Sequence, residues 1–188
     1  MRTETKIKPM NLPNLITVIR ILLTPVLIIL LLDASFNKAL AVFALAGLSD
    51  GLDGFLARYL RQKTTLGAYL DPIADKLLLS ATFITLATLE LVPSWLTVII
   101  VSRDVIIVLG IAMLFVSGSE VAIRPSIISK ITTLLQIITV FVILSRELWA
   151  VIWQMRATLI WLTTALTVLS GLHYIYFGVK IFSRVNEK

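Results

Sequence analysis

Long apolar runs separated by short polar turns dominate the chain. The six runs cover residues 18–32, 39–58, 68–91, 94–117, 126–145 and 157–179. They are about the length that an α-helix needs to cross the hydrocarbon core of a bilayer, roughly 20 residues. The pattern therefore predicts an all-α membrane protein with six transmembrane helices.

The chain before the first run is polar and then amphipathic. Asn14, Thr17 and Arg20 recur at three-residue spacing, so we expect them on one face of a helix. We predict a short N-terminal amphipathic interfacial helix that leads into the first span. Residues 1–17 would then be the cytoplasmic or interfacial start of a single membrane domain, 1–188. The apolar sequence follows without a small-residue cleavage site, which argues against a removable signal peptide.

The composition supports the membrane interpretation and narrows the chemistry. Apolar residues make up 58% of the chain, which exceeds the roughly 45–50% apolar content of soluble proteins. The mean hydropathy is +0.96. The chain has no cysteine and one histidine, which excludes disulfides, thiol nucleophiles and His-pair zinc motifs. The net charge of +6 fits basic cytoplasmic ends rather than nucleic-acid binding.

Lysine and arginine are distributed unevenly between the two sides of the predicted spans. With the N-terminus inside, the inner turns and tails carry Arg2, Lys6, Lys8, Arg58, Arg61, Lys63, Arg124, Lys180, Arg184 and Lys188. The outer turns carry only Lys38, Arg146 and Arg156. This positive-inside bias predicts that both termini are cytoplasmic.

Four aspartates lie between the second and third apolar runs, at the predicted cytoplasmic side. Asp50 and Asp53 are three residues apart, and Asp71 and Asp75 are four apart, so each pair shares a helix face. Four carboxylates without Cys or His form a hard-oxygen site, which suits Mg²⁺ or Mn²⁺, with Ca²⁺ as an alternative. Hard metals with open positions commonly bind phosphate groups.

The complete pattern is Asp50-x-x-Asp53-Gly54-x-x-Ala57-Arg58-x8-Gly67-x-x-x-Asp71-x-x-x-Asp75. It resembles, without a gap, the signature of the CDP-alcohol phosphatidyltransferases, and the six-span layout is also similar to that family. The resemblance implies that an acceptor hydroxyl attacks the β-phosphorus of a CDP-linked lipid and that CMP leaves. Phosphoryl transfer of this kind needs positioning and charge neutralisation, which two metal ions can supply.

The resemblance also implies roles for individual residues. Metal binding falls to Asp50, Asp53, Asp71 and Asp75, with Asp75 also the expected general base. CDP-lipid binding falls to Gly54, Ala57, Arg58, Thr64, Gly67, Asn14 and Thr17. The donor would be CDP-diacylglycerol, and the expected assembly is a homodimer in the bacterial inner membrane, with the active site facing the cytoplasm.

Charged residues inside the later runs bear on the acceptor. Arg103 and Asp104 lie midway along the fourth run, where they are either an internal ion pair or acceptor-binding residues. Lys130, Thr133 and Gln136 recur every three residues in the fifth run, and we expect them on one face. Arg103 with Lys130 would form a basic pocket for a phosphate-bearing acceptor, and we also assign Arg20 to that role.

The acceptor itself has two candidates. The run from Asn11 to Arg20 resembles bacterial phosphatidylglycerophosphate synthases, which predicts glycerol 3-phosphate. Those enzymes commonly carry a further arginine after the Arg-Asp pair, but residues 105–113 contain none. The stretches 102–107 and 125–136 resemble eukaryotic-type cardiolipin synthases, whose acceptor is phosphatidylglycerol. A divalent-cation transporter is the remote alternative, because buried acids could also serve transport, but the chain shows no internal repeat.

Overall fold

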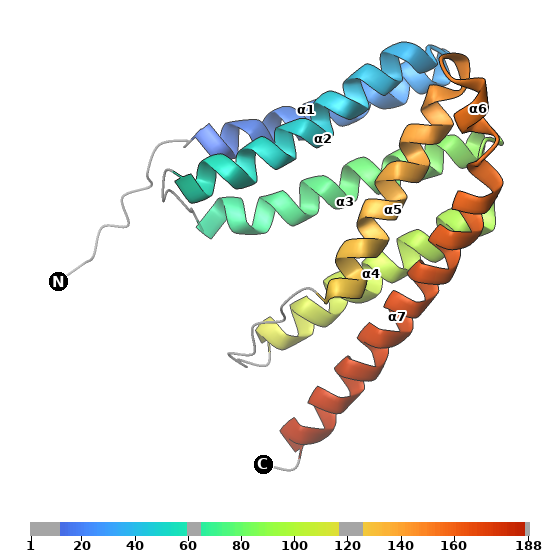
Figure 1. The fold of residues 1–188 in the computed structure, drawn as a ribbon. Coiled ribbons are helices and arrows are strands. Elements are labelled where there is room, and N and C mark those ends of the chain that lie inside the picture. The colour runs from blue at the N-terminus through green and yellow to red at the C-terminus, as the bar shows by residue number, and fades with distance from the viewer. Residues whose placement is uncertain (1–11, 60–64, 117–125, 187–188) are drawn as a thin grey trace. The chain divides into compact units, whose positions relative to one another are not determined.

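We describe a computed structural model of the 188-residue chain (Figure 1). It describes the backbone of residues 12–59, 65–116 and 126–186, and the side chains of 17–49, 74–109, 126–149 and 151–178. The elements are α1 (Leu12–Leu32), α2 (Phe36–Tyr59), α3 (Thr65–Thr88), α4 (Ser94–Val116), α5 (Ile127–Leu144), η1 (Ser145–Glu147), α6 (Ala150–Trp153) and α7 (Arg156–Asn186). The described residues contain no strand, which confirms the all-α prediction.

The six long helices follow the six predicted apolar runs, and they differ from them at several helix ends. The lead-in and the first run form one continuous helix, α1, so the described residues contain no separate interfacial helix before the first span. Helix α3 begins three residues before the predicted start at residue 68, and α7 continues past 179 into the charged tail. Hydrophobic periodicity locates helix centres better than helix ends, because polar residues can extend a helix beyond its apolar stretch.

Two helices in the described part of the chain are long and apolar enough to cross a membrane. They cover Ile127–Glu147 and Arg156–Gly178, with mean hydropathies of 2.2 and 1.4. Two shorter apolar helical stretches cover Thr17–Leu32 and Phe36–Ser49. The full count of six spans is not confirmed by these segments and stays a prediction.

The chain divides into two compact units, Met1–Ala81 and Thr82–Lys188. In the first unit, α1 and α2 lie side by side (Figure 1). The buried stripe of α1 recurs at three- and four-residue steps and consists of Thr17, Arg20, Thr24, Leu27 and Leu31. Among the described side chains of α2, the buried ones are Phe36, Ala39, Leu40, Phe43 and Ala46. Small alanines among larger side chains allow the backbones of membrane helices to approach closely.

In the second unit, α7 packs against both α4 and α5 (Figure 1). Helix α5 begins at the N-cap Ser126, whose hydroxyl accepts a hydrogen bond from the Ser129 amide at 3.2 Å. Thr97 of α4 donates its hydroxyl to the Phe83 carbonyl at the end of α3, at 3.1 Å. The first bond fixes the start of α5, and the second joins α4 to α3.

The connection between α5 and α7 carries tryptophans beside the two arginines that sequence analysis placed in an outer turn. The Arg156 guanidinium lies over the Trp153 ring at 4.4 Å from its centroid, and that of Arg146 lies at 5.9 Å. A second aromatic pair joins Trp95 of α4 to Trp161 of α7, with ring centroids 5.4 Å apart. Tryptophan flanked by arginine is typical of a segment at a membrane–water interface.

Candidate active site

The signature aspartates lie on α2 and α3. Asp50 and Asp53 belong to the last three turns of α2, while Asp71 and Asp75 belong to the first three turns of α3. Only residues 60–64 separate the two helices, and a chain of that length spans at most about 20 Å. The end of α2 and the start of α3 are therefore held near each other, as the sequence predicted.

Most of the predicted CDP and metal residues fall outside the described side chains. The backbones of Asn14, Asp50, Asp53, Gly54, Ala57, Arg58, Gly67 and Asp71 are helical, but their side chains are not described. Thr64 lies outside the described residues altogether. Their roles therefore stay predictions. Among the described side chains there is no group of three or more acidic or histidine residues that could hold a metal ion.

Asp75 is described, and its carboxylate is paired with Arg20. The Arg20 Nη1 donates to the Asp75 Oδ1 at 2.6 Å, which joins α1 to α3. The Arg20 side chain is fully buried, whereas that of Asp75 is 39% exposed. A buried guanidinium needs an anionic partner, because desolvating an isolated charge is costly. Sequence analysis placed Arg20 in acceptor binding and did not pair it with Asp75.

Thr17 and Thr24 flank Arg20 on the buried stripe of α1. Thr17, assigned to CDP-lipid binding from the sequence, is fully buried one turn before Arg20. Thr24 lies one turn after it and donates its hydroxyl to the Arg20 carbonyl at 3.1 Å. Pro25 follows directly within α1 and has no amide hydrogen to continue the helical ladder. A threonine bond of this kind and an internal proline both favour a local bend of the helix.

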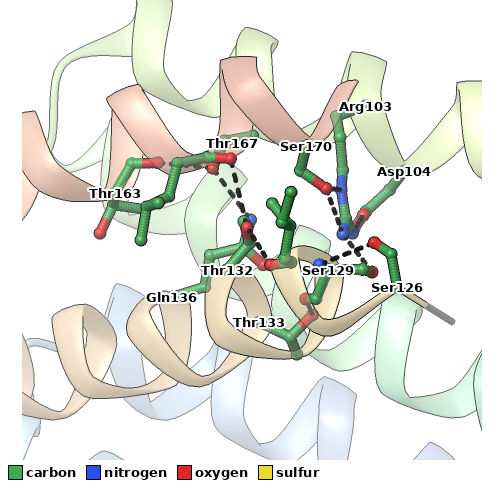
Figure 2. A network of polar contacts seen from close by, with 12 residues as sticks. Arg103, Asp104, Ser126, Ser129, Thr132, Thr133, Gln136, Thr163, Thr167 and Ser170 are labelled. Atoms are coloured by element: carbon green, nitrogen blue, oxygen red, sulfur yellow. Dashed lines mark hydrogen bonds and ion pairs between the residues drawn. The ribbon is translucent and has the colours of Figure 1, made fainter. Parts of the chain in front are cut away.

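Arg103 is the centre of a buried polar cluster in the second unit (Figure 2). Its Nη1 donates to the Asp104 Oδ1 at 2.7 Å, and its Nε and Nη2 donate to the Ser170 hydroxyl at 3.2 and 3.0 Å. Nη2 also donates to the Ser129 hydroxyl of α5. The Tyr174 ring lies 5.9 Å from the guanidinium carbon. One side chain of α4 thus contacts both α5 and α7, and the ion pair with Asp104 is the internal pair that the sequence left open.

The Arg103 cluster continues along α5 and α7 as a row of buried hydroxyl and amide groups, which we call the α5–α7 polar seam. The seam consists of Ser129, Thr132, Gln136 and Thr139 of α5 with Thr163, Thr167 and Ser170 of α7 (Figure 2 shows all but Thr139 by name). The bonds between the helices include Thr139 to Thr163 at 2.7 Å and Thr132 to the Leu166 carbonyl at 3.2 Å. Sequence analysis missed this seam apart from Gln136, although the three- and four-residue spacing of the polar positions is visible in both helices.

Lys130 and Thr133 are placed differently from Gln136. Lys130 is exposed, Thr133 is partly buried and donates to the Ser129 carbonyl at 3.1 Å, and Gln136 is fully buried. The expectation that the three share one face was therefore wrong. Lys130 directly follows Ser129, whose hydroxyl accepts a hydrogen bond from Arg103.

The donor set on α2 and α3 fits a hard divalent cation. All four signature side chains offer carboxylate oxygens, which Mg²⁺ and Mn²⁺ prefer, and the single described member is partly exposed. The Arg20 contact occupies one oxygen of Asp75 and supplies a positive charge beside it. A carboxylate held in this way is oriented before a metal arrives, as is common for metal ligands.

These features define an all-helical protein whose α2 and α3 carry a four-aspartate signature. The sequence profile of the CDP-alcohol phosphatidyltransferase family matches residues 10–169, which cover all four aspartates and the α5–α7 polar seam except Ser170. The chain therefore belongs to the CDP-alcohol phosphatidyltransferase family.

Relatives of two kinds are similar to the chain. The cardiolipin synthase (CMP-forming) of Rattus norvegicus is 36% identical over 203 residues, which covers 99% of this chain and 67% of the relative. The human protein of the same name is 36% identical over 196 residues, which covers 95% of this chain and 65% of the relative. The CDP-diacylglycerol–glycerol-3-phosphate 3-phosphatidyltransferase of Bacillus subtilis (strain 168) is 35% identical over 181 residues, which covers 87% of this chain and 93% of the relative. The chain thus spans about two thirds of the mammalian proteins and nearly all of the bacterial one.

Proposed function

We propose that the chain transfers a phosphatidyl group from CDP-diacylglycerol to the hydroxyl of glycerol 3-phosphate. The observation that carries this proposal is the family match over residues 10–169, which includes the unbroken Asp50–Asp75 signature. The products would be phosphatidylglycerophosphate and CMP. The Bacillus relative, which has nearly the same length as this chain, bears the name of that activity.

The reaction forms one P–O bond and breaks another. The acceptor oxygen bonds to the β-phosphorus, the bridging oxygen leaves with CMP, and the hydroxyl proton passes to a base. Asp75 is our candidate for that base, since its side chain is partly exposed and fixed by Arg20. A general base must reach the proton that it removes within hydrogen-bond distance.

We further propose that Asp50, Asp53, Asp71 and Asp75 hold two Mg²⁺ or Mn²⁺ ions. When bound, such ions neutralise the diphosphate and the leaving group of a phosphoryl transfer. Gly54, Ala57, Arg58, Thr64, Gly67, Asn14 and Thr17 are the proposed CDP-lipid residues. The protein would be a homodimer in the bacterial inner membrane, with its active site facing the cytoplasm.

Lys130 and Arg103, both predicted to bind the acceptor, differ in their exposure and contacts. Lys130 is exposed and can reach a phosphate group, whereas Arg103 is 2% exposed and bound to Asp104, Ser129 and Ser170. We propose that Lys130 contacts the acceptor and that Arg103 orders the start of α5, from which Lys130 projects. Direct binding of the acceptor by Arg103 would require it to exchange these internal partners.

Phosphatidylglycerol is the second candidate acceptor, and one observation favours it. The neutralised Arg103–Asp104 pair leaves less positive charge for a phosphate monoester than the sequence suggested, and residues 105–113 add no further arginine. The rat and human relatives, which match almost the whole chain, are named cardiolipin synthases. With this acceptor the product would be cardiolipin.

One experiment separates these candidates. Purified protein receives labelled CDP-diacylglycerol with glycerol 3-phosphate, phosphatidylglycerol, inositol phosphate or serine, and the lipid product is identified. Labelled phosphatidylglycerophosphate supports the first proposal, and cardiolipin supports the second. If the protein releases no CMP with any acceptor but moves divalent ions across proteoliposomes, it is a transporter and both proposals fail.

We predict that turnover depends strictly on a divalent metal. Excess EDTA should abolish CMP release, and added Mg²⁺ or Mn²⁺ should restore it, because the diphosphate charge is then neutralised again. Asp71→Asn should lower turnover at least about 100-fold. Loss of a residue that merely supports a metal ligand lowers activity by about 10–100-fold, and loss of the ligand itself should have at least as large an effect. Thr88→Val, which removes only a hydroxyl bonded to the Thr85 carbonyl, is the matched control and should keep full turnover. Undiminished turnover in EDTA would refute the metal site.

A further inference from the structure

Arg20 is a fully buried cation of α1, and it forms an ion pair with the signature carboxylate of Asp75 on α3. We infer that Arg20 is a positioning residue, which fixes the Asp75 carboxylate from α1, and that it does not bind the acceptor. The inference rests on the proposed function, since it assigns a role within the same site.

Burial is the first argument for this role. Arg20 lies in the middle of the buried stripe of α1, between Thr17 and Thr24, and none of its side chain is exposed. An acceptor that enters from water binds groups that it can reach, and the exposed member of this pair is Asp75. Arg20 therefore acts on the site through the carboxylate that it holds.

The geometry of the contact is the second argument. Nη1 and Oδ1 are 2.6 Å apart, which is the short distance of a charge-assisted hydrogen bond. Ala74 and Leu78 on α3 are buried, so Asp75 stands at the edge of the buried face of its helix. Removing the guanidinium would take this charge-assisted bond away from a carboxylate whose side chain is 39% exposed.

The third argument is that α1 is built to hold Arg20 in place. The Thr24 hydroxyl donates to the Arg20 carbonyl, one turn back along α1, and Pro25 follows Thr24 directly. Leu27 and Leu31 then anchor the same stripe with fully buried side chains. The position of the guanidinium is thus set by the packing of α1, and the position of Asp75 follows from it.

The test compares Arg20→Gln, Arg20→Lys, Asp75→Asn and the double variant Arg20→Gln/Asp75→Asn, each as the full chain in detergent. Two quantities are measured: the affinity for Mn²⁺ by electron paramagnetic resonance, and kcat and KM for glycerol 3-phosphate or phosphatidylglycerol. Thr88→Val, which removes a hydroxyl bond to the Thr85 carbonyl at the far end of α3, is the control and should leave both quantities unchanged.

We expect Arg20→Gln to lower Mn²⁺ affinity and kcat by about 10–100-fold, the usual cost of losing a residue that orients a metal ligand. KM for the acceptor should stay within about twofold, and Arg20→Lys should recover part of the loss because it keeps the charge. In the Asp75→Asn background, Arg20→Gln should cause no further loss of Mn²⁺ affinity, since the carboxylate that Arg20 positions is no longer present.

Three outcomes would overturn the inference. A tenfold rise in the acceptor KM with unchanged kcat would make Arg20 an acceptor-binding residue. Losses of Mn²⁺ affinity that multiply in the double variant would show that Arg20 acts independently of Asp75. Equal loss in Arg20→Lys and Arg20→Gln with unchanged Mn²⁺ affinity would reduce Arg20 to a role in packing. If the wild type releases no CMP, the proposed function fails. The Mn²⁺ affinities of the single and double variants still show whether Arg20 acts through Asp75.

Discussion

Arg103 shows how a buried charge is accommodated in this chain. Its guanidinium binds Asp104, the next residue, and two serine hydroxyls from other helices. Gly171 of α7 lies against the aliphatic part of this side chain, where a Cβ would be in ordinary van der Waals contact with the Arg103 Cγ at 3.7 Å. A charged residue inside a membrane span suggests function by default, but here the charge is neutralised locally and its hydrogen bonds join three helices. The residue is therefore a structural centre of the second unit.

We predict that Arg103→Gln lowers the free energy of unfolding by about 3–5 kcal/mol, because Asp104 is then buried without its cation. Arg103→Gln combined with Asp104→Asn should recover part of this loss, since both charges are gone. Thermal unfolding in detergent measures the effect, with Lys38→Gln as the control because Lys38 is exposed. A loss no larger than that of the control would contradict the assignment.

The residues around Arg103 also show where sequence reasoning stops. The sequence identified Arg103, Asp104 and Gln136 as candidates, but it grouped Gln136 with Lys130 because they fit a three-residue spacing. An α-helix turns by about 100° per residue, so two steps of three residues drift by about 120°. Steps of three and four residues stay on one face, and the structure buries Ser129, Thr132, Gln136 and Thr139. The partner of Arg20 could not be predicted either, since Asp75 is 55 residues away.

At the scale of elements, the α5–α7 polar seam joins two helices that are otherwise strongly apolar. Apolar side chains pack as well against lipid as against protein, so burial alone gives two membrane helices little preference for each other. Hydrogen bonds between them select one partner and one register. The seam begins at the Arg103 cluster and continues to the Thr139–Thr163 bond, which is 2.7 Å long.

The Thr139–Thr163 bond gives a test of the seam. We expect Thr139→Val to lower the free energy of unfolding by about 0.6 kcal/mol, and by no more than about 1.7 kcal/mol, the range for single hydrogen bonds between membrane helices. Thr164→Val is the matched control on the facing helix, because its hydroxyl bonds only the Ile160 carbonyl of the same helix. Denaturation in mixed micelles compares the two. An equal loss in both variants would show that the interhelical bond contributes nothing specific.

The helix ends at two predicted outer turns share one geometry. Ala34 and Glu90 have positive φ angles of 53° and 58°. Each is followed by an amide that bonds five residues back, Ser35 to the Leu30 carbonyl and Leu91 to the Leu86 carbonyl, both at 2.9 Å. This is the Schellman arrangement, in which glycine is the preferred residue at the left-handed position. Both positions hold a residue with a Cβ, which costs energy there.

We therefore predict that Ala34→Gly raises the free energy of unfolding, by about 0.5–1 kcal/mol. Glycine adopts the left-handed conformation without steric penalty, and this gain exceeds its larger entropy in the unfolded chain. Ala44→Gly in the interior of α2 is the matched control and should lower the free energy of unfolding, because no left-handed angle is relieved there. Thermal unfolding of the two variants should therefore shift in opposite directions.

At the scale of the whole molecule, the apolar pattern predicted most of the fold. Each of the six runs corresponds to a helix, and the turn near Pro93 separates α3 from α4 as expected. The number of membrane spans is not settled by the same pattern, since α2 and α3 mix apolar residues with the signature aspartates. Those residues lower the hydropathy of the helices that carry them. The segment from Asp50 to Asp75 therefore needs carboxylates for metal binding, whereas membrane insertion favours apolar residues in the same segment.

The distribution of basic residues leads to a prediction for the orientation of the molecule. The inner side carries ten lysines and arginines and the outer side three, so the positive-inside rule places the link between α2 and α3 in the cytoplasm. Because the natural chain has no cysteine, single cysteines report their side without background. We expect Asp33→Cys and Gln154→Cys to react with a membrane-impermeant maleimide in intact cells.

The cysteine-free parent should not be labelled, and Gln62→Cys should react only after the membrane is opened. Labelling of Gln62→Cys in intact cells would invert the topology. It would also separate the aspartates from cytoplasmic CDP-diacylglycerol, because the nucleotide head group must reach α2 and α3 from the side on which it is made. The same labelling pattern therefore tests both the predicted orientation of the helices and the access of CDP-diacylglycerol to the four aspartates.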